Sequence, residues 1–213
     1  MNCTLCDTLL TKMVDEYYFI CSTCGAYVKD KKYFIDNTRE KERYEEHNND
    51  VADVGYQNFT SPITNAILKN HNKQQLGLDY GCGTGPVIAK QLKDKDYQVK
   101  LFDPYFYPVY DYLNHQYDYI FSCEVFEHFN QPKLEIEKLV RLLKPEARLY
   151  IMTHLYNPDI NFTNWYYRND PTHVFIYTLK TIEFIVLKYS LTLEKISDRL
   201  IIAKNSLPSS GQS

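Results

Sequence analysis

The sequence predicts an α/β fold: a doubly wound, mostly parallel sheet preceded by a small metal-binding ribbon. Three observations lead to this prediction. Strand-like and helix-like segments alternate from Gly77 onward, four of the seven glycines lie within residues 77–85, and four of the six cysteines lie within the first 24 residues. Such alternation is typical of a parallel sheet with helices on both faces. The glycine and cysteine clusters each indicate a site.

The cysteines come in two pairs, Cys3-x2-Cys6 and Cys21-x2-Cys24. Two CxxC pairs at this distance are typical of a tetrahedral zinc site in a ribbon. Because all four positions are cysteine, no coordination position is left open, and we expect a structural zinc ion. The alternative is four unrelated buried cysteines.

The order of segments divides the chain into four parts. Residues 37–50 are highly charged, lack glycine and proline, and predict a helix. We expect a zinc ribbon over residues 1–34, a helical linker or cover over 35–70, the main domain over 71–205 and a disordered tail over 206–213. Three polar residues at helical spacing in the linker either roof the active site or form a solvated face: Tyr44, His47 and Asn48.

The main domain begins with the strand LGLDY and continues as PVIAKQLK (helix), YQVKLFD (strand), YDYIFSC (strand), PKLEIEKLVRLLK (helix) and ARLYIMT (strand). The segment TLKTIEFIVLKYS predicts a further helix. LTLEKIS and RLIIAKN then predict a closing antiparallel pair of strands.

The glycine cluster follows the first of these strands directly. Gly81, Gly83 and Gly85 permit a tight turn that a ligand can approach closely, before Pro86 opens a helix. Asp103 ends the next strand, 24 residues after Asp79, where a carboxylate can accept hydrogen bonds from both hydroxyls of a ribose. The pattern GxGxG lacks the third glycine of a dinucleotide-binding loop, where Pro86 stands.

From these residues the chain resembles the class I S-adenosylmethionine-dependent methyltransferases. LDYGCGTG resembles their first motif, LFDP the acidic end of their second strand, YDYIFSCEVFEHF their fourth strand with its turn, and LLKPEARLYIMT their fifth strand. The resemblance covers about residues 77–205. It implies a Rossmann-like sheet of seven strands with the last antiparallel, and S-adenosylmethionine as cofactor.

The resemblance also implies roles for single residues. Gly81 and Gly83 would contact the methionine part of the cofactor together with the intervening Cys82, and Asp79 would organise its amino end. Asp103 would hold the ribose. Two residues would flank the sulfonium: Cys123 and Glu124. The segment between Asp103 and Tyr117 is too short for the usual helix and third strand, so we expect Tyr105 or Phe106 to stack on the adenine instead.

The turn after the fourth strand carries Glu124-x-x-Glu127-His128. It resembles the ExxEH element of ubiquinone-biosynthesis O-methyltransferases and small-RNA 2'-O-methyltransferases, which binds a divalent ion beside the acceptor. Such an ion would be magnesium, manganese or zinc and would lower a hydroxyl pKa. Three residues are candidates for a further ligand: His154, Asp170 and His173.

Two alternatives to this metal site stay open. Glu127 and His128 could cap the following helix or bond to the backbone, and His128 or His173 could act as a general base without metal. The aromatic run Trp165, Tyr166 and Tyr167 could hold the sulfonium or a planar acceptor, or fill the core of a lid.

We expect a methyltransferase that acts on a small-molecule acceptor, with metal-assisted O-methylation as its specific form. The alternatives are an RNA methyltransferase whose ribbon binds RNA, a protein methyltransferase, and a noncatalytic scaffold. The net charge is −3, and residues 1–50 hold seven Lys or Arg against ten Asp or Glu, which disfavours RNA and argues against DNA. The amino terminus has no secretory pattern and no apolar run reaches the length of a membrane span, so we expect a cytoplasmic protein.

Overall fold

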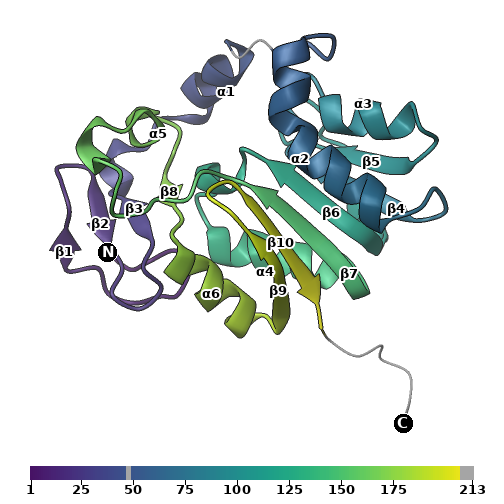
Figure 1. Ribbon diagram of the computed structural model, residues 1–213. Coiled ribbons are helices and arrows are strands. Elements are labelled where there is room, and N and C mark those ends of the chain that lie inside the picture. The colour runs from purple at the N-terminus through teal and green to yellow at the C-terminus, as the bar shows by residue number, and fades with distance from the viewer. Residues whose placement is uncertain (47–48, 207–213) are drawn as a thin grey trace.

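The computed structural model describes residues 1–46 and 49–206 and contains two sheets (Figure 1). The larger has six strands in the order β5-β4-β6-β7-β10-β9, and the smaller has four in the order β1-β2-β3-β8. Helices cover both faces of the larger sheet, so the predicted α/β fold class is confirmed.

The larger sheet is parallel from β5 through β4 and β6 to β7, whereas β10 runs antiparallel to both β7 and β9. Its strands are β4 (Leu76–Tyr80), β5 (Gln98–Phe102), β6 (Tyr117–Cys123), β7 (Leu143–Met152), β9 (Leu191–Ile196) and β10 (Leu200–Asn205). Each of the six overlaps a segment predicted as a strand, although β7 begins at Leu143 and so includes residues 143–144, which were predicted as the end of the preceding helix. The parallel arrangement brings the ends of β4, β5 and β6 to one edge of the sheet.

Alternate residues of each strand enter two separate cores, since successive side chains point to opposite faces. Tyr119 and Phe121 of β6 pack with the helices α2 and α3, whereas Ile120 between them packs with α4 and α6. These helices are α2 (Val54–Asn70), α3 (Val87–Lys93), α4 (Pro132–Leu142) and α6 (Leu179–Lys188). Figure 1 shows α2 and α3 on one side of the sheet and α4 and α6 on the other.

Among the described residues the sheet has six strands and not the seven that we expected. Between Asp103 and Tyr117 the chain forms only a short 3-10 helix, η2 (Tyr110–Asn114). The segment is too short for a further parallel strand with its crossovers, because each crossover connection alone needs a dozen or more residues. As a result β5 is the edge strand.

The smaller sheet is built from the cysteine-rich amino terminus and one distant segment. Its strands are β1 (Lys12–Met13), β2 (Tyr18–Ile20), β3 (Tyr27–Lys29) and β8 (Phe175–Ile176). β8 follows the short helix α5 (Tyr166–Asn169) and pairs with β3. The four cysteines of the first 24 residues lie in or against one core with α4 and α6, so the ribbon packs on the side of the main sheet that these two helices cover.

Helix α1 (Asn37–Glu45) follows β3 and precedes α2 in the chain. It lies beside the site described below. Asp36 caps it by accepting hydrogen bonds from the backbone of Thr38 and Arg39. The helix ends at Glu45, earlier than the predicted Asp50, because residues 50–53 turn into the next helix. His47, Asn48 and residues 207–213 of the predicted tail lie outside the described residues. Within the described ranges no helix is both long and apolar enough to cross a membrane.

Candidate active site

A cavity of about 1200 Å³ opens at the carboxyl ends of β4, β5 and β6. The glycine-rich loop, the end of β5, the turn after β6 and helix α1 all contribute to its walls. Every residue proposed for cofactor binding from the sequence lines it except Asp79, which lies just beneath it. The cavity is therefore the candidate active site.

The glycine-rich loop has the backbone shape that the sequence predicts. Gly81 and Gly83 adopt φ values of 81° and 62°, in the left-handed region that favours glycine. The amides of Gly81 and Cys82 both donate to the carbonyl of Phe102, which ties the loop to β5. A Cβ on Gly81 would meet Val125 at 2.5 Å, so this glycine also makes room for the turn after β6.

Gly85 serves packing between chain segments. A Cβ at this position would lie 1.6 Å from the carbonyl oxygen of Asn49, just before α2. Gly85→Ala is therefore expected to displace residues 49–53 and to cost about 1–3 kcal/mol of stability, as overpacking does. Chemical denaturation measures this cost, and Gly55→Ala is the control because a Cβ there meets only a side-chain oxygen at 3.0 Å. Equal stability of the two variants would contradict the expectation.

Asp103 lines the cavity and is hydrogen-bonded directly to the glycine-rich loop. Its carboxylate accepts hydrogen bonds from the amide of Gly83 at 3.0 Å and from those of Tyr105 and Phe106 at 2.9 and 3.1 Å. A carboxylate has about four acceptor sites, so capacity for a ligand hydroxyl remains. Asp79 lies buried beneath, and burial together with the negative charge of Asp103 raises its pKa to about 8.

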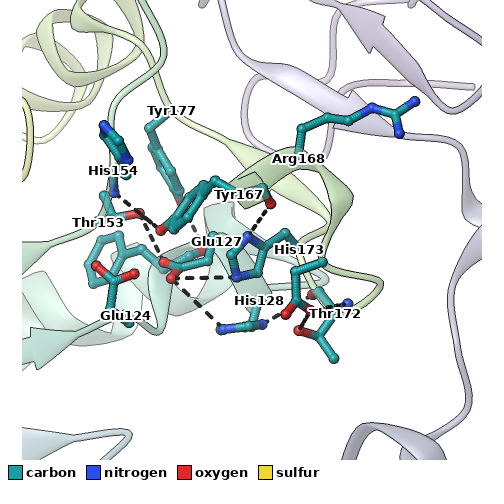
Figure 2. Close-up of polar contacts among 12 residues, drawn as sticks. Glu124, Glu127, His128, Thr153, His154, Tyr167, Arg168, Thr172, His173 and Tyr177 are labelled. Carbon is teal, nitrogen blue, oxygen red and sulfur yellow. Dashed lines mark hydrogen bonds and ion pairs between the residues drawn. The ribbon is translucent and has the colours of Figure 1, made fainter. Parts of the chain in front are cut away.

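Glu127, His128 and His173 bring three metal-binding atoms together beside this cleft (Figure 2). Glu127 Oε1 lies 3.8 Å from His128 Nε2 and 3.9 Å from His173 Nε2. The Glu127 side chain is 0% exposed, and its Oε1 is buried without a hydrogen-bond partner. A buried carboxylate oxygen with no donor is costly unless a ligand or ion satisfies it.

Backbone carbonyls orient both imidazole rings. The Nδ1–H of His128 donates to Thr172 O at 3.1 Å, and that of His173 donates to Tyr167 O at 2.6 Å. Because a carbonyl can only accept, each Nδ1 carries the proton and the neutral ring keeps an Nε2 lone pair. Burial lowers the pKa of His173 to about 4, which favours its neutral form. Both lone pairs thus converge on Glu127 Oε1.

The second carboxylate oxygen of Glu127 accepts a hydrogen bond from a residue at the end of β7. Thr153, which directly follows this strand, donates to Glu127 Oε2 at 2.9 Å and is in hydrogen-bond contact with the Tyr167 hydroxyl at 2.8 Å (Figure 2). Sequence reasoning did not single out Thr153. Its position at the carboxyl end of a parallel strand was the available signal, because functional residues of such sheets gather at that edge.

Glu124 lies outside this triad, although it belongs to the same predicted ExxEH element as Glu127 and His128. Its backbone has a φ of 52°, which is unusual for a residue other than glycine and typical of functional turns. Its Oε1 lies 3.6 Å from the Arg199 guanidinium. Burial, with the charge of Glu127, raises the pKa of Glu124 to about 8. Arg199 comes from the loop between β9 and β10 and carried no motif that would have identified it.

The other two candidate ligands are engaged elsewhere. Asp170 pairs with Arg43 of α1 at 2.9 Å and accepts a hydrogen bond from the amide of Thr172. His154 Nδ1 lies 3.1 Å from both the Tyr166 hydroxyl and Arg199. Of the three residues that could complete the ExxEH element, only His173 lies with Glu127 and His128.

Aromatic side chains from α1 and α5 surround the triad. The ring of Tyr44 stands edge-on to His128, with centroids 5.2 Å apart, and its hydroxyl donates to Glu40. Trp165 and Tyr167 are buried, whereas Tyr166 is largely exposed. Tyr44 thus lies over the site, which agrees with the first of the two alternatives given for the linker. In the aromatic run 165–167, two side chains lie in the core and one lies on the surface.

The four amino-terminal cysteines form a second cluster, in the core that the ribbon shares with α4 and α6. All four Sγ atoms lie within 4.8 Å of one another, with Cys3 to Cys24 at 3.7 Å and Cys6 to Cys21 at 3.4 Å. These separations are much longer than the roughly 2.05 Å of a disulfide bond. They are close to the edge of about 3.8 Å of a sulfur tetrahedron around zinc with Zn–S bonds of about 2.3 Å.

Comparison with known proteins places residues 53–196 in a family described as a methyltransferase domain. A search among curated proteins finds no match. Three similar solved structures all share only the fold, at 13–15% identity. An O-methyltransferase family protein from Burkholderia thailandensis has a TM-score of 0.53, with 83% of this chain and 61% of that chain covered.

The matches to the other two solved structures cover nearly the whole length of those proteins. Magnesium protoporphyrin IX methyltransferase from Synechocystis has a TM-score of 0.52, with 83% of this chain and 98% of that chain covered. The N-methyltransferase NodS from Bradyrhizobium japonicum also has a TM-score of 0.52, with 80% and 99% covered. The fold of this chain is thus one that known methyltransferases have.

Proposed function

Because the chain belongs to the family of methyltransferase domains, we propose that it transfers the methyl group of S-adenosylmethionine to a hydroxyl of a small-molecule acceptor beside a divalent metal ion. The observation that carries the proposal is the buried, unpartnered Oε1 of Glu127 between the Nε2 atoms of His128 and His173. His128 and His173 line the same cavity as the glycine-rich loop, and Glu127 lies buried behind them.

The residues around the glycine-rich loop support S-adenosylmethionine as the cofactor. We assign its contacts to Asp79, Gly81, Cys82, Gly83, Asp103 and Cys123. The compared structures of magnesium protoporphyrin IX methyltransferase and NodS both contain S-adenosylhomocysteine. In this chain the Asp103 carboxylate binds the Gly83 amide and keeps acceptor capacity beside the glycines, which suits a methionine moiety over the glycine backbone and a ribose hydroxyl at the carboxylate.

The donor set supports a divalent ion at the triad. One carboxylate oxygen and two imidazole nitrogens are the ligands of sites that bind ions such as Mn²⁺, Fe²⁺ or Zn²⁺ with open positions for substrate. Such an ion, when bound, supplies Lewis acidity that lowers the pKa of an acceptor hydroxyl. Glu127 is fixed by Thr153, and both rings are fixed by carbonyls, so the ligands are already oriented.

The remaining side chains align the reactants and exclude water. Methyl transfer is an in-line displacement, so its rate depends mainly on holding the acceptor oxygen behind the methyl group. Tyr44 covers His128, and the Arg43–Asp170 pair joins α1 to the loop that carries His173. Glu124 remains a proposed site residue, which we assign to the sulfonium side of the cavity beside Arg199.

We propose a structural zinc ion for the four cysteines. Cys3, Cys6, Cys21 and Cys24 fit a tetrahedral site by the separations of their sulfur atoms. The acidic balance of residues 1–50 and the packing of the ribbon against the main sheet favour a small-molecule acceptor over RNA. An expected location in the cytoplasm agrees with reduced thiols.

Labelled methyl transfer tests the proposed reaction. Purified protein is incubated with methyl-labelled S-adenosylmethionine and a fractionated cell extract, with and without added Mn²⁺. We expect label in the small-molecule fraction and a clear increase with Mn²⁺. Label confined to RNA or protein would contradict the acceptor class. Full transfer by protein that carries only the one zinc ion of its cysteine site and no other metal would contradict a metal at the triad.

Asp103→Ala is expected to weaken S-adenosylmethionine binding by about 1.5–3 kcal/mol, which is the loss of charge-assisted hydrogen bonds to the ribose. Isothermal titration calorimetry measures the change. Asp111→Ala is the control, since Asp111 is an exposed carboxylate that pairs with Lys100 on the neighbouring surface. Unchanged affinity in Asp103→Ala would remove the ribose assignment.

A further inference from the structure

Residues 167–174, which we call the His173 loop, determine the geometry of the candidate metal site. The loop supplies His173 itself, and its carbonyls at Tyr167 and Thr172 accept the Nδ1–H groups that orient both imidazoles. Its last residue, Val174, donates its amide to Glu127 O at 2.9 Å. A movement of this loop would therefore displace His173, change the orientation of the His128 ring and shift the backbone of Glu127.

The ribbon contacts the opposite side of the same loop. On β2, the Tyr18 hydroxyl donates to the carbonyl of His173 at 2.6 Å, and the Tyr18 side chain is fully buried. On β3, the Lys29 ammonium donates to Pro171 O at 2.8 Å and to Asp170 O at 3.4 Å, while the Lys29 amide donates to Val174 O at 2.9 Å. With a longer contact from the Tyr18 hydroxyl to the carbonyl of Arg168 at 3.4 Å, five hydrogen bonds join two ribbon residues to the loop.

A charged pair completes this attachment. Asp15, just before β2, binds the guanidinium of Arg168 near the start of the loop, and both side chains are only 12% exposed. The Lys29 side chain is itself buried, and burying an ammonium is costly unless its donors are satisfied. The carbonyls of the loop are what satisfy it.

We infer that Tyr18 and Lys29 are positioning residues of the metal site, so that the cysteine ribbon sets the affinity of the Glu127–His128–His173 triad for its ion. This inference rests on the proposed function, because it requires a metal at the triad. It assigns the ribbon a role in the active site that its cysteine motif alone does not indicate. The two metal sites are then coupled through hydrogen bonds from β2 and β3 to the His173 loop.

Manganese titration of the full-length, zinc-loaded protein tests the coupling, with free Mn²⁺ measured by electron paramagnetic resonance. Mn²⁺ prefers oxygen and nitrogen ligands and leaves zinc in its thiolate site. We expect Tyr18→Phe and Lys29→Met each to raise the dissociation constant about tenfold. This is the low end of the effect of outer-shell changes, because the lost bonds reach the backbone that carries the ligands and not the ligand side chains. Both variants keep the size of the side chain and should keep one zinc ion per chain.

Tyr117→Phe is the matched control. The Tyr117 hydroxyl is also buried and donates to a backbone carbonyl, that of Tyr112 at 2.9 Å, but Tyr117 begins β6 at the end remote from the site. The variant loses the same kind of bond, and we expect its Mn²⁺ affinity to stay within twofold of the unchanged protein. If Tyr18→Phe loses its zinc, Lys29→Met decides the comparison.

His173→Ala separates the two ways in which the inference can be wrong. If His173→Ala abolishes Mn²⁺ binding but Tyr18→Phe and Lys29→Met bind as Tyr117→Phe does, the coupling is overturned and the metal site stands. If His173→Ala binds Mn²⁺ as the unchanged protein does, or neither binds it, the metal site itself is overturned and the coupling with it.

Discussion

Cys24→Ser is expected to remove the zinc ion and to unfold the small sheet. The ribbon strands are only two or three residues long, and a structure of that size needs a metal or disulfides to be stable. Loss of a structural metal is among the few changes that cost more than about 4 kcal/mol. Zinc content by atomic absorption and the free energy of unfolding by chemical denaturation measure the two effects.

Cys82→Ser is the control for this change. Cys82 is also buried but lies in the glycine-rich loop, outside the four-cysteine cluster. We expect this variant to keep one zinc ion per chain. A Cys24→Ser protein that kept both its zinc and its stability would show that the four cysteines do not form the proposed site.

Glu127→Gln is expected to weaken Mn²⁺ binding at the triad by at least about 100-fold. The substitution preserves size but exchanges a charged ligand oxygen for a neutral amide, whereas changes to outer groups alone typically cost 10- to 100-fold. It also removes the negative charge from a side chain that is wholly buried. The expected result is therefore lost metal binding in a protein that is at least as stable as before.

Glu135→Gln provides the comparison for Glu127→Gln. Glu135 is a half-buried carboxylate on α4 that accepts hydrogen bonds from Tyr80 and Lys138, and it lies outside the triad. We expect unchanged Mn²⁺ affinity in this variant. Equal affinities of the Glu127 and Glu135 variants would contradict the assignment of Glu127 as a ligand.

Local sequence patterns predicted the strands and helices of the main sheet well. Each parallel strand contains apolar residues that the core buries, and the glycines after β4 permit the positive φ values that Gly81 and Gly83 adopt. Asp103 could be placed because the end of one parallel strand lies beside the end of the next. The predicted number of seven strands was wrong. It was taken from the usual count of the family, although residues 104–116 are too few to form the additional strand with its crossovers.

The triad could be predicted only in part. Glu127 and His128 are adjacent in a motif, but the choice among His154, Asp170 and His173 depends on the path of a loop that no local pattern determines. Tyr18 and Lys29 fix that path from more than 140 residues away in the sequence. Contacts of this range depend on the tertiary fold, so the sequence alone left three candidates.

The pairing of β3 with β8 has a consequence for how the protein is made. Tyr18 and His173 are 155 positions apart, so a nascent chain on the ribosome carries its cysteines long before β8 has been synthesised. Such distant pairing slows folding, because a long loop must close first. The cysteine-rich segment has to persist through most of translation without its last strand, held by the β1–β2–β3 pairings and by the zinc ion that we propose.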